Sequence, residues 1–246
     1  MERFTQLYPD RADGLTALDV VADLPRPAPE GRPWVALNMV STLDGRVTVA
    51  GRTGAITNQA DYELFHATRE RVDAILVGAE TIRVESYGRT INSAEGRARR
   101  EQAGLPGDSI AVVLTRSVSL PADVGLLRAA ENTVVVLTPS ADGELPESAA
   151  EVRYLREVDP AVGLVRLREE YGVRSLVCEG GPHLNATLLP AGLVDELHIV
   201  FAPKVAGGED PLTVFSGPGI DPPLELELRT LHESGGYLFA RYGVGR

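Results

Sequence analysis

The sequence predicts a three-layer α/β fold with a mixed sheet and helices on both faces. Short apolar runs rich in β-branched residues recur along the first two thirds of the chain, separated by helical patterns, and they predict buried strands. Later segments alternate apolar and polar residues, which is typical of strands with one face in water. The chain has 246 residues and is 43% hydrophobic, which is enough for a sizeable core. We therefore expect one α/β domain.

The N-terminal segment, residues 1–32, is predicted to be an arm and linker. It ends in the run Leu24–Pro33, in which four prolines disfavour regular structure. Residues 33–246 are predicted to form the functional domain, and they open with the apolar strand Trp34–Val40.

Helix and strand signals then alternate along the chain. A helix is expected over 59–71, because the side chains at Thr57 and Asn58 suit a helix N-terminus. The apolar or amphipathic runs predict strands at 74–78, 109–114, 133–137, 175–178, 196–202, 225–231 and 237–242, and helices at 160–171 and from Pro182 to Leu189. The last strands are expected to be more antiparallel than the first.

Composition excludes several classes of protein. The net charge of −11 argues against a general surface for nucleic acid or for an anionic membrane. Cys178 is the single cysteine, so no disulfide can form within the chain, and the four histidines are too scattered for metal-ligand spacing. No apolar run approaches the length of a membrane span. We expect a cytoplasmic protein that holds no metal and binds neither nucleic acid nor a membrane.

The sharpest local signal is the segment Glu179-Gly-Gly-Pro182, where a buried strand runs into two glycines and a helix start. Glycines allow close approach of a ligand to the backbone, and a helix N-terminus offers free N–H groups, so the segment suits a pyrophosphate. We expect a positive φ at Gly181. A tight turn without a ligand remains an equal alternative. Glu179 could orient or protonate a substrate nitrogen, or it could be a solvated turn residue.

Two other strand ends carry polar residues. Gly78 and Thr81 repeat the pattern of strand, glycine and hydroxyl, and Arg116 and Ser117 follow the third strand. An arginine there suits a 2′-phosphate, whereas an acid would suit a free ribose hydroxyl. An arginine after a strand is also ordinary on a protein surface; if the site holds a nicotinamide dinucleotide, Arg116 predicts NADPH in preference to NADH.

In order along the chain, the motifs Ser41-Thr-Leu-Asp-Gly-Arg46, Leu76-Val-Gly-Ala-x-Thr81, Glu179-Gly-Gly-Pro182 and the run 191–204 form one combination. It resembles the reductase domain of riboflavin biosynthesis, a family of pyrimidine reductases with a dihydrofolate-reductase-like fold. The resemblance covers about residues 33–243. It implies NADPH-dependent reduction of the ribosylamino side chain of a phosphorylated aminopyrimidine to a ribitylamino chain, of the 5-amino-6-(5-phosphoribosylamino)uracil reductase type. A homodimer is implied as well.

The resemblance also implies roles for particular residues. Those expected to contact the cofactor are Ala55, Thr57, Gly78, Thr81, Glu85, Arg116, Ser117, Gly180, Gly181, Pro182, His183 and Leu184. Those expected to contact the substrate are Asn38, Ser41, Thr53, Arg69 and Glu179, with Arg69 at the phosphate. Glu179 and Asp44 are expected to be catalytic.

Three departures from the family pattern leave the substrate open. Asn38 stands where the family usually has lysine, Glu85 where it has aspartate, and Ala55 where it has an aromatic residue. If the lysine matters, restoring it by Asn38→Lys is expected to increase activity. Two alternatives remain: an NADPH-dependent reductase of another heterocycle, such as a dihydropterin, and a non-catalytic NADP-binding protein.

Overall fold

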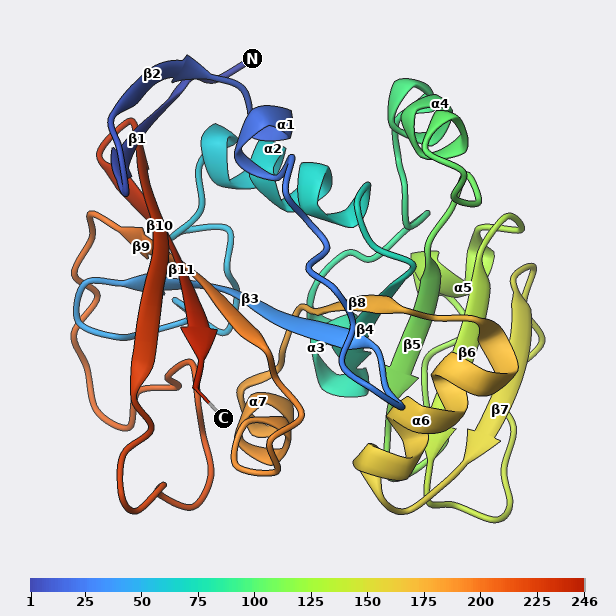
Figure 1. Cartoon of the computed structure of the whole chain (residues 1–246). Helices are drawn as coiled ribbons and strands as arrows, with labels where there is room; N and C mark the ends of the chain where they lie inside the picture. Colours follow the sequence, from blue (N-terminus) through green and yellow to red (C-terminus); the bar gives the residue numbers. More distant parts are fainter. Residues whose placement is uncertain (246) are drawn as a thin grey trace. The chain divides into compact units, whose positions relative to one another are not determined.

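A computed structural model describes residues 1–245, which divide into two compact units (Figure 1). Unit 1 comprises Met1–Leu24, Val35–Thr68 and the chain from Glu179 onward, and unit 2 comprises Pro25–Trp34 and Arg69–Cys178. The predicted residues of the functional site are therefore shared between two units. Helices occur with parallel and antiparallel strands, as the predicted α/β class requires.

Unit 2 contains a parallel sheet with the strand order β8-β4-β5-β6-β7. The strands are β4 (Ala74–Gly78), β5 (Ile110–Leu114), β6 (Thr133–Thr138), β7 (Glu151–Arg156) and β8 (Ser175–Cys178). The side chains of β8 and the central residues of β4, β5 and β6 are buried, which explains why these strands are nearly continuous apolar runs. This confirms the four apolar strands, whereas β7, which carries charges at three of its six positions, was not predicted.

The helices of unit 2 are α3 (Ala79–Val84), α4 (Ala94–Gln102), α5 (Gly125–Arg128) and α6 (Pro160–Tyr171). The helix predicted over 160–171 is confirmed as α6. Asp159 caps its N-terminus, and Gly172 ends it in the left-handed conformation. A Cβ at Gly163 would lie 2.9 Å from Leu137, so α6 packs closely on β6.

Unit 1 contains the strands β2-β1-β10-β11-β9-β3 in that spatial order. They are β1 (Phe4–Tyr8), β2 (Ala12–Leu15), β3 (Trp34–Thr42), β9 (Glu196–Ala202), β10 (Leu226–Ser234) and β11 (Tyr237–Val244). Only β3 and β9 pair in parallel; the other pairs are antiparallel. The expected change from parallel to antiparallel strands is confirmed for β10 and β11.

The helices of unit 1 are α1 (Ala17–Val20), α2 (Gln59–Arg69, whose last residue falls in unit 2) and α7 (Pro182–Leu188). Asn58 caps α2 through its side-chain oxygen, which accepts from the N–H of Asp61 at 2.9 Å, as predicted for this helix start.

The N-terminal arm contains regular structure before its proline-rich end. β1 pairs with β10, and Thr16 and Asp19 form a capping box at the start of α1. The segment 24–33 contains no helix or strand. Among residues 1–245, no helix is both long and apolar enough to cross a membrane.

Candidate functional site

The Glu179–Pro182 loop connects β8 to α7 and has one backbone position that requires glycine. Gly180 has a φ of +89°, and a Cβ there would lie 2.8 Å from the sulfur of Met39 on β3. Gly181 has a φ of −66°, so the expected positive φ at Gly181 is wrong. The positive φ lies one residue earlier, because Gly180 makes the sharp turn and Gly181 is already the N-cap of α7. The peptide bond between the two glycines is cis.

The start of α7 leaves backbone donors without a side-chain cap. Pro182 occupies the first turn, as predicted, and Gly181 has no side chain with which to cap the helix. Glu179, just before the glycines, is only 7% exposed. The loop therefore combines a turn restricted to glycine, uncapped N–H groups and a buried carboxyl group, which suits an anionic, nitrogen-containing ligand.

A segment that the sequence did not single out holds α7 in place. The Asn185 side chain donates to the carbonyl of Val214 at 2.9 Å, and the N–H of Ser216 donates to the carbonyl of Pro182. Nδ1 of His183 lies 2.6 Å from the carbonyl of Ser216, and because a carbonyl only accepts, Nδ1 carries the hydrogen. The ring of His183 is thus held by the carbonyl of Ser216, and the side chain of Leu184 is buried.

The turn before α2 brings together two predicted cofactor residues. Lys204 donates to the carbonyl of Ala55 at 2.8 Å. The hydroxyl of Thr57 donates to Asp61, whose pKa is raised by burial against the lowering effect of this hydrogen bond. Thr53 closes the turn through its carbonyl, which accepts from Ile56. Ala55 is exposed, so its surface is accessible to a ligand.

Asp44 is exposed and fixes a loop. Its carboxylate accepts hydrogen bonds from the N–H groups of Ala206 and Gly207, the shorter at 2.7 Å. Hydrogen bonding to Thr42, and then to these N–H groups, lowers the pKa of Asp44 to about 2. This carboxylate stays ionised and is suited to holding the loop in position, which is a different task from the catalytic one expected from the sequence.

Asn38 and Ser41 lie on opposite faces of β3. The register of β3 against β9 is regular from residue 36 to residue 42, so side chains alternate and positions 38 and 41 cannot share a face. Ser41 is on the same face of β3 as Met39, whose sulfur lies beside Gly180, and the hydroxyl of Ser41 donates to the carbonyl of Thr42. Asn38 instead lines a small cavity on the side of α2.

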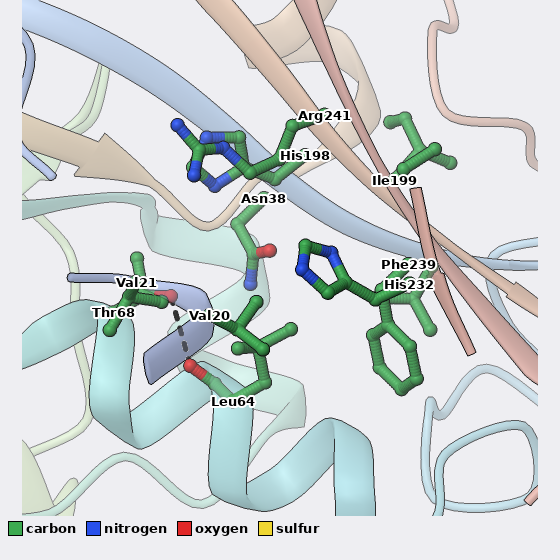
Figure 2. Close-up of a pocket in the computed structure, with 12 residues that line it drawn as sticks. Val20, Val21, Asn38, Leu64, Thr68, His198, Ile199, His232, Phe239 and Arg241 are labelled. Carbon is green, nitrogen blue, oxygen red and sulfur yellow. Dashed lines mark hydrogen bonds between the residues drawn. The ribbon is translucent and has the colours of Figure 1, made fainter. Parts of the chain in front are cut away.

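This cavity has a volume of about 20 Å³, close to what one water molecule needs. Figure 2 shows Asn38, His198, His232 and Arg241 around it, with Leu64 and Thr68 of α2 on the other side. His232 is 2% exposed, and its Nδ1 has no hydrogen-bond partner. The cavity is lined by these polar side chains together with a larger number of apolar ones, and it is too small for a nucleotide or a pyrimidine.

A buried charge cluster borders the cavity. Arg241 donates to Asp23 at 2.7 Å and to Glu196 at 3.2 Å, and Nε2 of His198 lies 3.1 Å from the same Glu196 oxygen. Burial raises the pKa of Glu196, but the hydrogen bond with His198 and the charge of Arg241 outweigh it and leave this pKa below its usual value. Burial lowers the pKa of His198, and burial with the charge of Arg241 lowers that of His232 to about 4.

In unit 2, Gly78 is the N-cap of α3 and provides no side-chain cap, and Thr81 lies in the first turns of that helix. The N–H of Glu85 donates to the carbonyl of Thr81 at 2.8 Å and ends the helix. These residues repeat the arrangement of the Glu179–Pro182 loop: a strand, a glycine and an uncapped helix start.

Arg116 and Ser117 form an exposed turn at the carboxyl end of β5, where the hydroxyl of Thr115 donates to the carbonyl of Ser117 at 2.5 Å. Arg69 is only 6% exposed. Its guanidinium donates to the carbonyl of Thr90 at 3.3 Å and lies 5.3 Å from the centre of the Tyr87 ring. Arg116 is thus accessible, whereas Arg69 is held in place on several sides.

Comparison with known proteins identifies the class. The RibD C-terminal domain family matches residues 33–237. A 2,5-diamino-6-ribosylamino-4(3H)-pyrimidinone 5′-phosphate reductase of Methanothermobacter thermautotrophicus is 33% identical over 87% of this chain and 99% of that protein. The riboflavin biosynthesis protein RibD of Actinobacillus pleuropneumoniae is 28% identical, over 87% of this chain and 57% of that longer protein.

Solved structures agree with this. A pyrimidine reductase-like protein of Corynebacterium diphtheriae superposes with a TM-score of 0.76 at 24% identity, covering 94% of this chain and all of that one. A deaminase/reductase of Thermotoga maritima gives a TM-score of 0.71 at 22% identity over 87% of this chain and 57% of that one. The dihydrofolate-reductase-like α/β fold is confirmed, and the protein is an oxidoreductase of the pyrimidine reductase class. The chain belongs to the RibD C-terminal domain family of riboflavin biosynthesis.

Proposed function

We propose that the chain reduces 2,5-diamino-6-ribosylamino-4(3H)-pyrimidinone 5′-phosphate, converting its ribosylamino side chain to a ribitylamino chain with NADPH. The observation that carries this proposal is the 33% identity to a reductase named for that substrate, which spans 99% of the relative. Two further relatives with the same name match over 87% and 76% of this chain. This refines the uracil-type substrate expected from the sequence to the diaminopyrimidinone.

The residues present fit a nicotinamide dinucleotide. The Glu179–Pro182 loop offers uncapped N–H groups and a turn that only glycine permits, and Gly78 offers an uncapped helix start in unit 2. Pro182, His183 and Leu184, with Ala55, Thr57, Thr81, Glu85 and Ser117, complete the set proposed to hold the cofactor. When bound, the cofactor supplies the hydride, so the protein has to provide orientation and a proton.

Each proposed substrate contact has a separate task. Glu179 is buried and is suited to hold or donate a proton at a substrate nitrogen, and Arg69 is suited to pair with the phosphate. Ser41 and Thr53 are proposed to orient the substrate. Asp44 is proposed to act indirectly, by holding the loop at Ala206 and Gly207.

Steady-state kinetics with the diaminopyrimidinone substrate and NADPH test this assignment. Arg69→Ala is expected to raise KM at least tenfold, roughly the loss of a charge-assisted anion contact, with a smaller change in kcat. Glu179→Gln is expected to lower kcat by about a hundredfold, because a proton donor acts mainly in the transition state. Dihydropterin reduction without activity on the pyrimidine would replace the proposal with the other heterocycle. Cofactor binding without any turnover would contradict the enzymatic role.

The cofactor preference is tested by titrating NADPH and NADH. Arg116 is exposed at the end of β5 and is proposed to contact the 2′-phosphate that only NADPH carries. Arg116→Ala should weaken NADPH binding by about thirtyfold, equivalent to the loss of one charge-assisted hydrogen bond of about 2 kcal/mol, and should leave NADH binding unchanged. Arg128→Ala, at an exposed arginine in α5, is the matched control. Equal affinities for the two cofactors in the unmodified protein would contradict the assignment.

We also propose a homodimer that uses one face of β9, β10 and β11. Leu238 and Leu226 are 37% and 39% exposed, and their cross-strand partners, Phe201 and Val244, are partly exposed beside them. Sedimentation should show a dimer, and Leu238→Asp should shift it toward the monomer. A monomer at micromolar concentration would contradict this.

A further inference from the structure

Arg100 is the most deeply buried arginine of unit 2, and its position is unusual for a charged side chain. It lies in the last turn of α4 and is 1% exposed, although α4 is otherwise a strongly polar helix. Full burial of an arginine is costly unless its donors are used. The hydrogen-bond partners of Arg100 therefore indicate its structural role.

Two nitrogens of Arg100 donate to backbone carbonyls, two of them at the end of α2 and one just after α4, whereas the buried Nη2 has no hydrogen-bond partner among residues 1–245. Its Nη1 donates to the carbonyl of Arg69 at 3.0 Å and to that of Val72 at 2.7 Å, and its Nε donates to the carbonyl of Pro106 at 2.8 Å. The last carbonyls of a helix have no partner within it, so a cation at this end supplies both hydrogen bonds and favourable charge. Arg100 thus fixes the end of α2 at Arg69.

A second donor meets the same carbonyl. The hydroxyl of Ser109 donates to the carbonyl of Arg69 at 3.2 Å. The side chain of Arg69 is oriented separately, by the carbonyl of Thr90 and the ring of Tyr87. The backbone of Arg69 is therefore anchored by Arg100 and Ser109, while its guanidinium is directed by other groups.

We propose that Arg100 is a positioning residue for the phosphate of the substrate, acting through the backbone of Arg69. This inference rests on the proposed function, in which the guanidinium of Arg69 pairs with that phosphate. A phosphate contact needs the guanidinium held to within a fraction of an ångström, and the loss of an anchor on its backbone relaxes that position. Arg100 itself does not touch the substrate.

The test is a double-mutant cycle of Arg69→Ala and Arg100→Met. Arg100→Met alone is expected to raise KM for the phosphorylated substrate about tenfold, with kcat nearly unchanged, and to weaken the binding of ribose 5-phosphate by a similar factor. In the Arg69→Ala background, Arg100→Met should change neither quantity, because the group through which it acts is gone. Arg99→Met is the matched control, since Arg99 pairs with Glu70 and not with Arg69.

The outcomes separate the inference from the proposed function. If Arg69→Ala leaves KM unchanged, Arg69 does not bind the phosphate, and both its proposed role and the positioning role of Arg100 are wrong, while the reductase activity itself remains. If Arg69→Ala raises KM but Arg100→Met lowers kcat alone, or raises KM equally in both backgrounds, only the positioning role of Arg100 is wrong.

Ser109→Ala covers the case in which Arg100→Met does not fold. It removes the other donor to the Arg69 carbonyl without leaving a buried charge. It should raise KM about threefold, and this increase should vanish in the Arg69→Ala background. An unchanged KM, or an equal increase in both backgrounds, would overturn the inference.

Discussion

The two units bury arginine in different ways. Arg241 of unit 1 is 5% exposed and is paired with the carboxylates of Asp23 and Glu196, with two histidines nearby. Arg100 of unit 2 is 1% exposed and is paired with three backbone carbonyls. Arg241 is part of an ionisable cluster, whereas Arg100 donates to the backbone carbonyls at the end of α2.

This difference determines how each unit responds to acid and to mutation. Carbonyls do not titrate, and arginine stays protonated at ordinary pH even where burial lowers its pKa, as it does for Arg100. Around Arg241, the pKa values of Glu196, His198 and His232 are all shifted. We therefore expect the stability of unit 1 to depend on pH, whereas the contacts of Arg100 do not.

The largest expected effect comes from removing the cation of the ionisable cluster. Arg241→Met leaves Glu196 buried without its ion partner, and the free energy of unfolding should fall by about 3 kcal/mol. Chemical denaturation at pH 7 measures this. Arg229→Met, which removes an exposed arginine paired with the exposed Glu227, should cost less than about 0.5 kcal/mol. Equal effects of the two substitutions would show that the cluster contributes no more than a surface pair.

The next effect is the acid sensitivity of unit 1. The pKa of His232 is lowered to about 4, from 6.5 in the unfolded chain, so the unfolded state binds more protons between these values. The contribution of neutral His232 to stability is therefore fully present above pH 6.5 and is lost as the pH falls toward 4. The pKa of Glu196 is also lowered in the folded protein, so further stability is lost as the pH falls below the usual pKa of a glutamate.

Substitution of the histidine isolates its share. Between pH 7 and pH 5, His232→Gln should remove on the order of 2 kcal/mol of the stability loss seen in the unmodified protein. Denaturation curves at several pH values measure this. Above pH 7, the two proteins should show the same pH dependence, which serves as the internal control. If the stabilities of the two proteins change in parallel down to pH 5, the pKa of His232 is not lowered by burial.

The last effect concerns Asn38, at the edge of the same cluster. Its side chain lines the cavity of about 20 Å³ beside Arg241, so Asn38→Lys would place a second cation there. We now expect a loss of about 2 kcal/mol in stability and no increase in activity, contrary to the expectation from the sequence alone. Asn38→Leu, similar in size and uncharged, is the matched control. Higher kcat/KM with unchanged stability would restore the first expectation.

Much of the fold could be read from local patterns. The strands β4, β8 and β9 and the helix α6 begin and end at the predicted residues, because each is a continuous apolar run or a capped helical pattern. The strand β7 and the helix α4 are among the elements that were missed, as are β1, β2 and α1 in the predicted arm. β7 carries charges at three of its six positions. α4 is almost entirely polar, and Arg99 and Arg100 join it to the end of α2, which is far away in sequence.

The site divides in the same way. The glycines before α7, the exposed Arg116 and the family resemblance could be recognised from short motifs, because each depends on neighbours in the chain. The positive φ at Gly180, the separation of Asn38 from Ser41 and the partners of Arg241 follow from strand register and packing. Asp23 and Arg241 are 218 positions apart, and no local pattern encodes such a pairing. Burial of charge depends on which groups meet in space, so it is decided by the tertiary structure.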